Sequence, residues 1–219
     1  MNLFVKLKPL LLSVLIIAGL TLQSQEAQAG PNKTITLAGG CFWCVEADFE
    51  KVPGVISAVS GYTGGTVKNP TYKQVTRGGT GHYEAVQITY DAGRVSLESL
   101  LSAFFRSVDP TDAGGQFCDR GESYRTAIFV SDSAENAAAK KAKSDAQAAL
   151  GKKIVTPILN AKPFYKAEDY HQGYYKGSSL VLTRFGPLSQ AKAYKRYRDA
   201  CGRDQRVKQL WGNAALFAG

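Results

Sequence analysis

Residues 39–44, with the sequence GGCFWC, separate two patterns that require different secondary structures. The preceding run KTITLA, residues 33–38, alternates apolar and polar side chains as a half-buried strand does. The following run CFWCVEADFEKV, residues 41–52, has apolar side chains at helical spacing and ends at a Pro-Gly pair. The two glycines therefore mark a sharp turn from strand to helix, with Cys41 at the helix start and Cys44 one turn further on.

Patterns along the rest of the chain predict further strands and helices in mixed order. Strands are expected within residues 55–65, 82–91, 124–131 and 153–159, and helices at 97–108 and 133–150. Ser133 is the expected N-cap of the alanine-rich second helix, and Gly151 its stop. Because strands and helices do not alternate strictly, we expect an α+β fold, a single-domain two-layer sandwich of a mixed or antiparallel sheet with helices.

Residues 1–29 have the composition of a cleaved signal peptide. Two lysines precede a leucine-rich run at 10–22, and the closing AQA at 27–29 fits the small-x-small cleavage rule. The run is shorter than the ~20 residues that a membrane span needs. We therefore expect cleavage after Ala29, one domain over 30–219, and a periplasmic or secreted location. A membrane would be a partner only if this segment stayed uncleaved.

The chain is basic, with a formal net charge of +9, and much of the excess lies near its end. The basic residues of this carboxy-terminal segment, about 190–219, are Lys192, Lys195, Arg196, Arg198, Arg203, Arg206 and Lys208. A basic surface can attract nucleic acid or an anionic membrane. Nucleic acid is not an expected partner of an exported protein, so we expect a solvated helical face.

Three kinds of site are compatible with the CxxC pair. A structural zinc site needs four ligands, and the sequence offers only two histidines, His82 and His171, and no second CxxC. A structural disulfide would close a very small loop and so stabilise the fold little. A redox pair has a physical basis, because a helix N-terminus stabilises a thiolate and would lower the pKa of Cys41. Cys44 would then be its redox partner.

Two aromatic residues, Phe42 and Trp43, lie between these cysteines. They could be ordinary core residues. Beside an exposed thiolate they could also form an apolar pocket, and a methyl thioether packs well against aromatic rings.

The motif GGCFWC resembles the signature of the peptide methionine sulfoxide reductase A family, as a GCFWC variant. Further segments resemble the family in the same order: SGYTGGTVKNPTYKQV (60–75), GHYEAVQITYD (81–91), DPTDAGGQFCDRGESYRTAIF (109–129) and AEDYHQGYY (167–175). The expected fold then has a ferredoxin-like core. The resemblance implies thiol-dependent reduction of free and peptide-bound methionine S-sulfoxide, with oxidised exported proteins as substrates and no metal or organic cofactor.

The resemblance also implies a role for each candidate residue. Cys41 would attack the sulfoxide sulfur while Glu84, in GHYEAV, protonates the oxygen, which requires a raised carboxyl pKa. Tyr72 and Tyr124 would hydrogen-bond the sulfoxide oxygen, and Asp119 would be a further carboxylate of the site. Phe42 and Trp43 would form the pocket for the methyl group of the substrate. Without the resemblance, Glu84 could equally be an outward strand residue and Asp119 a turn cap.

The second cysteine is where the sequence departs from the common family pattern. Many members have glycine at the position of Cys44 and recycle through cysteines in a Gly-rich tail. That tail is replaced here by residues 191–212, which have a helical pattern and carry Cys201. We expect Cys44 to resolve the sulfenic acid because it is nearest, with Cys201 as alternative resolver or relay. Cys118 is a third candidate, or a small buried apolar residue.

An external thioredoxin-like dithiol protein would reduce the resulting disulfide. Two other classes of protein explain part of the pattern. A thioredoxin-like dithiol oxidoreductase would use the CxxC pair but leaves GHYEAV unexplained. A non-catalytic binding module would use the basic carboxy-terminal segment to hold an anionic partner.

Overall fold

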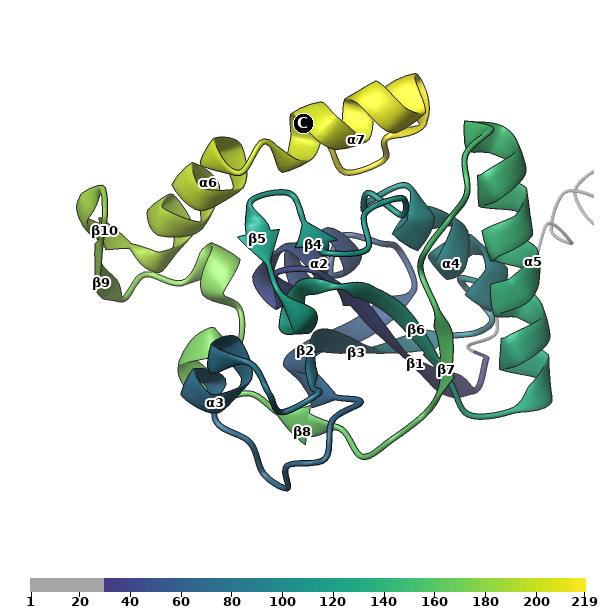
Figure 1. The fold of residues 1–219 in the computed structure, drawn as a ribbon, viewed down its shortest axis with the longest axis horizontal. Helices are drawn as coiled ribbons and strands as arrows, with labels where there is room; N and C mark the ends of the chain where they lie inside the picture. Colours follow the sequence, from purple (N-terminus) through teal and green to yellow (C-terminus); the bar gives the residue numbers. More distant parts are fainter. Residues whose placement is uncertain (1–29) are drawn as a thin grey trace, which may run out of the picture.

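The computed structural model describes residues 30–219. The expected signal peptide and its cleavage site lie outside the described residues. The described chain folds into one mixed sheet with helices packed on it and two small hairpins (Figure 1). The expected α+β fold class is confirmed.

Within residues 30–219, six strands form the main sheet in the order β7-β6-β1-β3-β2-β8. Their bounds are Asn32–Gly39 (β1), Val55–Thr63 (β2), Tyr83–Asp91 (β3), Thr126–Val130 (β6), Ile158–Asn160 (β7) and Tyr165–Lys166 (β8). Neighbouring strands are antiparallel except β6 and β7, which are parallel. The hairpins pair β4 (Gly115–Gln116) with β5 (Asp119–Arg120), and β9 (Leu180–Thr183) with β10 (Gly186–Ser189).

The helices are α2 (Phe42–Phe49), α3 (Tyr72–Arg77), α4 (Leu97–Phe105), α5 (Ser133–Leu150), α6 (Gln190–Ala200) and α7 (Arg203–Trp211). Short 3₁₀ turns lie at Glu122–Tyr124, Asp169–His171, Tyr174–Lys176 and Gly212–Ala214. Thr71 and Gln74 form a capping box at the start of α3. Gly151 ends α5 in the left-handed conformation, as expected. In residues 30–219 none of the helices has the length and apolar character needed to cross a membrane.

The two faces of the main sheet carry cores of different size. Ile35, Leu37 and Ile88 pack with apolar residues of α2, α4 and α5 in the larger core. Ala38 and Ala85, which point the other way, belong to a small separate cluster. Since side chains alternate along a strand, the helices cover one face, as in the expected two-layer sandwich.

Two details of the expected elements are wrong. The N-cap of α5 is Asp132, whose carboxylate accepts the N–H of Glu135 at 2.8 Å, and Ser133 is already helical. Of the strand expected at 153–159, only the end is present, in β7. Pro157 has no N–H to donate to a strand ladder, which explains why pairing begins only after it.

Helices α6 and α7 follow one another along the part of the domain that holds α2 and the β4–β5 hairpin (Figure 1). This segment is helical, as expected, and Gly202 breaks it in the left-handed conformation, with φ of 66°. The expectation that its basic face is fully solvated is wrong for two residues. The side chains of Arg198 and Arg203 are only 10% and 2% exposed.

Candidate active site

A cavity of about 530 Å³ opens between the start of α2, the β4–β5 hairpin and the helices α6 and α7. Every candidate site residue predicted from the sequence lines it: Cys41, Phe42, Trp43, Cys44, Tyr72, Glu84, Cys118, Asp119, Tyr124 and Cys201. These residues come from segments that are far apart in the sequence. The fold therefore brings them together at one place.

Cys41 and Cys44 lie at the start of α2 as two free thiols. Cys41 is the N-cap residue and is half-buried, whereas Cys44 is buried. The Cys44 N–H donates to the Cys41 carbonyl at 3.1 Å, so both side chains lie on one side of the first turn. Gly40 before them has φ of +83°, and a Cβ there would lie 2.6 Å from the Cβ of Gln116. Only glycine fits this turn.

The expected low pKa of Cys41 is wrong. Hydrogen bonding with Cys44 raises the pKa of the Cys41 thiol well above its usual range, and burial and the Glu84 charge act in the same direction. The helix N-terminus does not offset this, because the Phe42 N–H donates to Glu84 instead. The thiol with the lowered pKa is Cys44, at about 7, through the hydrogen bond from Cys41 and then the charges of two arginines.

Glu84 has the environment that a general acid needs. It lies on β3, is 1% exposed, and accepts the Phe42 N–H on Oε2 at 3.0 Å. Its Oε1 is buried without a hydrogen-bond partner among the described residues. Burial raises the pKa of Glu84 to about 8, although the Phe42 hydrogen bond opposes the shift. The carboxyl group is therefore mostly protonated at neutral pH and can donate.

Tyr72 and Tyr124 reach the cavity from the start of α3 and the end of a 3₁₀ turn. Burial and the nearby charge of Glu84 raise the pKa of both phenols far above their usual value, so both remain neutral donors. Glu168 fixes the start of α3, because it accepts the Tyr72 N–H and the Tyr62 hydroxyl, each at 2.9 Å. Glu168 was not predicted as a site residue, although the stretch AEDYHQGYY contains it.

Aromatic rings form one wall of the site. The Trp43 ring stacks on Tyr174 with centroids 3.9 Å apart, and the Phe42 ring is stacked on Tyr72 at 6.3 Å. The ring of His171 lies 5.1 Å from Phe42 and 5.5 Å from Trp43. Burial lowers the pKa of His171 to about 4, so this ring is neutral. The wall has the composition that favours contact with a methyl thioether.

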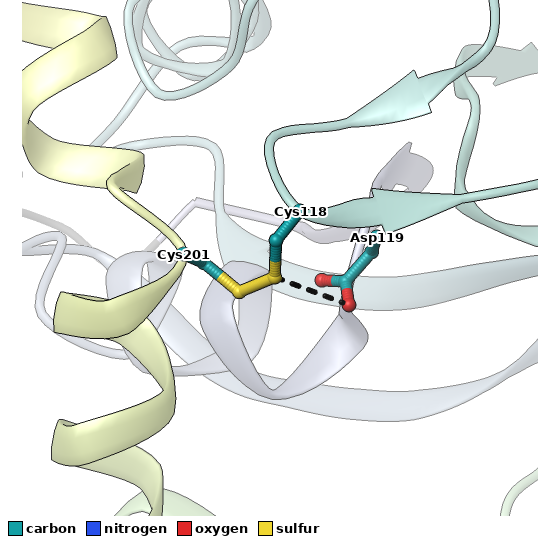
Figure 2. Close-up of side chains that lie close together, drawn as sticks. All are labelled: Cys118, Asp119 and Cys201. Carbon is teal, nitrogen blue, oxygen red and sulfur yellow. Dashed lines mark hydrogen bonds between the residues drawn. A yellow bond between two sulfur atoms is a disulfide. The ribbon is translucent and has the colours of Figure 1, made fainter.

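The other two cysteines are bonded to each other. Figure 2 shows Cys118, in the turn of the β4–β5 hairpin, joined to Cys201 at the end of α6. The Sγ of Cys118 lies 3.8 Å from Oδ1 of Asp119, and burial raises the pKa of this carboxyl. The sulfurs and this carboxylate lie within 4.8 Å of one another, but disulfide sulfurs are not thiolate ligands for a metal. Of the candidate second cysteines, only Cys44 lies as a free thiol beside Cys41.

The buried Arg203 and the half-buried Arg198 also line the cavity. Arg203 donates from Nη1 to the Gly39 carbonyl at 3.2 Å and from Nη2 to the Ser107 carbonyl at 2.9 Å. Arg198 donates to Oδ1 of Asp48 at 2.9 Å. Sequence reasoning missed both residues as part of the site, because a basic helix pattern alone does not distinguish a buried arginine from a solvated one.

Comparison with known proteins identifies the family of this chain. The family described as peptide methionine sulfoxide reductase matches residues 33–213. Peptide methionine sulfoxide reductase MsrA 2 of Caulobacter vibrioides is 48% identical over 188 residues, which is 85% of this chain and 89% of that protein. The MsrA 2 of Staphylococcus aureus is 47% identical over 180 residues, which is 81% and 95% of the two chains.

Two solved structures are similar to a large part of this chain. Reduced Mxr1 from Saccharomyces cerevisiae has a TM-score of 0.63 and 36% identity, over 65% of this chain and 83% of that one. Methionine sulfoxide reductase A of Corynebacterium diphtheriae has a TM-score of 0.61 and 30% identity, over 74% and 86%. The chain belongs to the peptide methionine sulfoxide reductase family. Within it, the relatives place this enzyme with the MsrA reductases.

Proposed function

We propose that this enzyme reduces the S-sulfoxide of methionine, free or within a peptide, by thiol chemistry at Cys41. The observation that carries the proposal is the buried Glu84 carboxyl, which lines the same cavity as Cys41, has no hydrogen-bond partner for Oε1 among the described residues, and has its pKa raised to about 8 by burial. A sulfoxide sulfur becomes electrophilic when its oxygen receives a proton. A buried acid, two neutral phenols and a thiol in one cavity meet that need.

The reaction proceeds in two chemical steps. The sulfur of Cys41 attacks the sulfoxide sulfur and Glu84 protonates the oxygen. The oxygen passes to the Cys41 sulfur as methionine leaves, so that Cys41 becomes a sulfenic acid and its thiol proton returns to the Glu84 carboxylate. Cys44 then attacks the sulfenic sulfur, which forms the Cys41–Cys44 disulfide and releases water. The pairing of Cys201 with Cys118 supports Cys44 as the resolving residue, since Cys44 needs no chain movement to reach Cys41.

The enzyme also needs an external reductant and a place of action. A thioredoxin-like dithiol protein would reduce the Cys41–Cys44 disulfide and complete the cycle. The pattern of residues 1–29 supports export, so the substrates would be oxidised periplasmic or secreted proteins. The thioredoxin-like alternative gives no role to the buried acid Glu84, and family membership disfavours it.

The test uses a peptide that contains methionine S-sulfoxide, with dithiothreitol as reductant and chromatography to measure methionine. The purified protein should consume the S epimer and spare the R epimer. Cys41→Ser should abolish the reaction. Sulfoxide consumption that persists in Cys41→Ser, or equal use of both epimers, would reject the proposal.

A further inference from the structure

The β9–β10 hairpin, which precedes α6, is a small sheet at the border of the active-site cavity (Figure 1). In the part of the chain that the structure describes, these two strands pair only with each other, so each has one free edge. Leu182 and Thr183 of β9, and Arg184 in the turn, line the cavity that Cys41 also lines. Strand β9 is therefore part of the wall of the candidate active site.

The backbone groups of two β9 residues point toward its free edge. Leu182 lies opposite Pro187, which has no N–H, so this pair cannot exchange hydrogen bonds and its backbone groups point outward. The Gln190 N–H donates to the Ser179 carbonyl at 3.0 Å, which places Leu180 in a second pair of the same kind. The N–H and C=O groups of Leu180 and Leu182 can therefore pair with another strand.

The two edges of the hairpin differ in how open they are. On β10, Pro187 cannot donate at its outward position, and an edge proline hinders pairing with another chain. Strand β9 has the sequence LVLT and contains neither proline nor a charged side chain. No backbone hydrogen bond joins Leu180 or Leu182 to another segment of residues 30–219. The edge of β9 is thus open, and that of β10 is protected.

The open edge is also apolar. Leu180 is 76% exposed and Leu182 is 87% exposed, although leucine is usually buried. Side chains two residues apart on a strand share a face, so the two leucines form one apolar strip along β9. At the turn, the Arg184 guanidinium lies 4.8 Å from the ring of Phe185 and forms no ion pair among the described residues. A fitting partner is therefore extended and aliphatic, without basic side chains.

We propose that an extended segment of an oxidised protein pairs with the open edge of β9 and so places its methionine sulfoxide in the cavity. This inference rests on the proposed function and specifies its substrate class: extended polypeptide with aliphatic residues near the sulfoxide. Leu180 and Leu182 are then specificity-determining residues.

Strand pairing suits an enzyme that must accept many protein sequences. Main-chain hydrogen bonds along an edge supply affinity without regard to sequence, and contacts with alternate side chains add a preference. Oxidation of methionine disrupts apolar cores, so the segments that become accessible have aliphatic neighbours. The apolar strip of Leu180 and Leu182 matches such segments.

Peptide binding tests the docking without turnover. The protein is Cys41→Ser, which should leave the sulfoxide intact, and the probe is a short fluorescein-labelled peptide with methionine S-sulfoxide at its centre. Three versions carry valine, serine or lysine at the second residue on either side of the sulfoxide, positions that share its face of an extended strand. By fluorescence anisotropy the valine peptide should bind about tenfold more tightly than the serine peptide, and the lysine peptide most weakly. Equal affinities overturn the proposal.

Matched variants test whether the preference belongs to β9. Leu180→Thr combined with Leu182→Thr keeps side chains that suit a strand but removes the apolar strip, so it should cancel most of the difference between the valine and serine peptides. Leu216→Thr makes the same change at a leucine that is 62% exposed and does not line the cavity, and it should preserve the difference. A preference that survives the double variant, or that Leu216→Thr also removes, rejects the role of β9. Circular dichroism establishes that each variant is folded.

Strand pairing itself is tested in the substrate. N-methylation of one peptide nitrogen at a time removes one donor, so binding should weaken at alternate residues. No effect at any position, or an equal effect at all of them, overturns the pairing. Unchanged peptide binding in the double variant, with slower recycling by a thioredoxin-like reductant, would assign the edge to the reductant and reject the proposal. The binding assay involves no reduction, so its failure is distinct from a failure of the proposed function.

Discussion

Replacing Glu84 by glutamine separates the stability of the fold from catalysis. Glutamine has the same shape and can still accept the Phe42 N–H, but it does not ionise. Burial raises the pKa of Glu84 from its usual 4.5 to about 8. Between these pH values the folded protein keeps a proton that the unfolded chain has lost, so folding is linked to pH.

The sign of the pH dependence of stability follows from this bound proton. A raised carboxyl pKa contributes stability that is fully present below pH ~4.5 and is lost as the pH rises through about 8. A shift of about 3.5 units corresponds to about 5 kcal/mol when the loss is complete, and to about 3 kcal/mol at pH ~7. Glu84→Gln does not suffer this loss. The free energy of unfolding of Glu84→Gln, relative to that of the parent, should therefore increase by these amounts as the pH rises.

Urea unfolding of both proteins at acid, neutral and alkaline pH measures this difference. Other buried carboxyls with raised pKa, such as Glu46 and Asp48, are common to both proteins and cancel. In single-turnover assays Glu84→Gln should reduce sulfoxide about 10²–10⁴-fold more slowly. A stability difference that stays constant with pH would refute the buried-acid argument, and an unchanged reductive rate would remove Glu84 from the acid role.

Three further predictions concern the cysteines and the phenols. Cys44→Ser should still release about one methionine per enzyme and then stall as a sulfenic acid that dimedone traps. Cys201→Ser should still form the internal disulfide, and the reverse outcome would make Cys201 the resolving residue. Replacing both Cys118 and Cys201 by serine should lower the free energy of unfolding by about 4–5 kcal/mol, because the disulfide closes a loop with a sequence separation of 83; calorimetry that shows no loss would contradict this. Tyr72→Phe and Tyr124→Phe should each slow the reductive step, and the double variant more than either; rapid-quench rates equal to the parent would exclude their contact with the sulfoxide oxygen.

Local patterns predicted the parts of the fold that local forces determine. The alternation of apolar and polar residues in 82–91 predicted β3 within one residue, although the folded strand is buried along most of its length. The cap of α5 was placed one residue late, since Asp132 and Ser133 are both good N-caps and the sequence does not rank them. The glycine pair predicted the turn that positions Cys41, and Gly40 does adopt the conformation that requires glycine.

The electrostatics of the site were harder to predict because they depend on partners far along the chain. The helix N-terminus predicted a low pKa for Cys41. However, Glu84 accepts the Phe42 N–H, and the arginine charges lower the pKa of Cys44. The sequence near Arg203 shows a polar helix and no sign of burial. Only the docking of α7 on the carbonyls of residues 39 and 107 buries it.

The dithiol at the start of α2 and the arginines of α6 and α7 lie near opposite ends of the described chain. This separation determines when the complete site can form during synthesis. Synthesis proceeds from the amino terminus, so Cys41 and Cys44 emerge long before α6 and α7 exist. Contacts of such long sequence separation also form slowly during folding. A nascent or carboxy-terminally cleaved chain would hold both thiols without the cavity wall that α6 and α7 supply. The last helices to be synthesised would therefore complete the site around the dithiol.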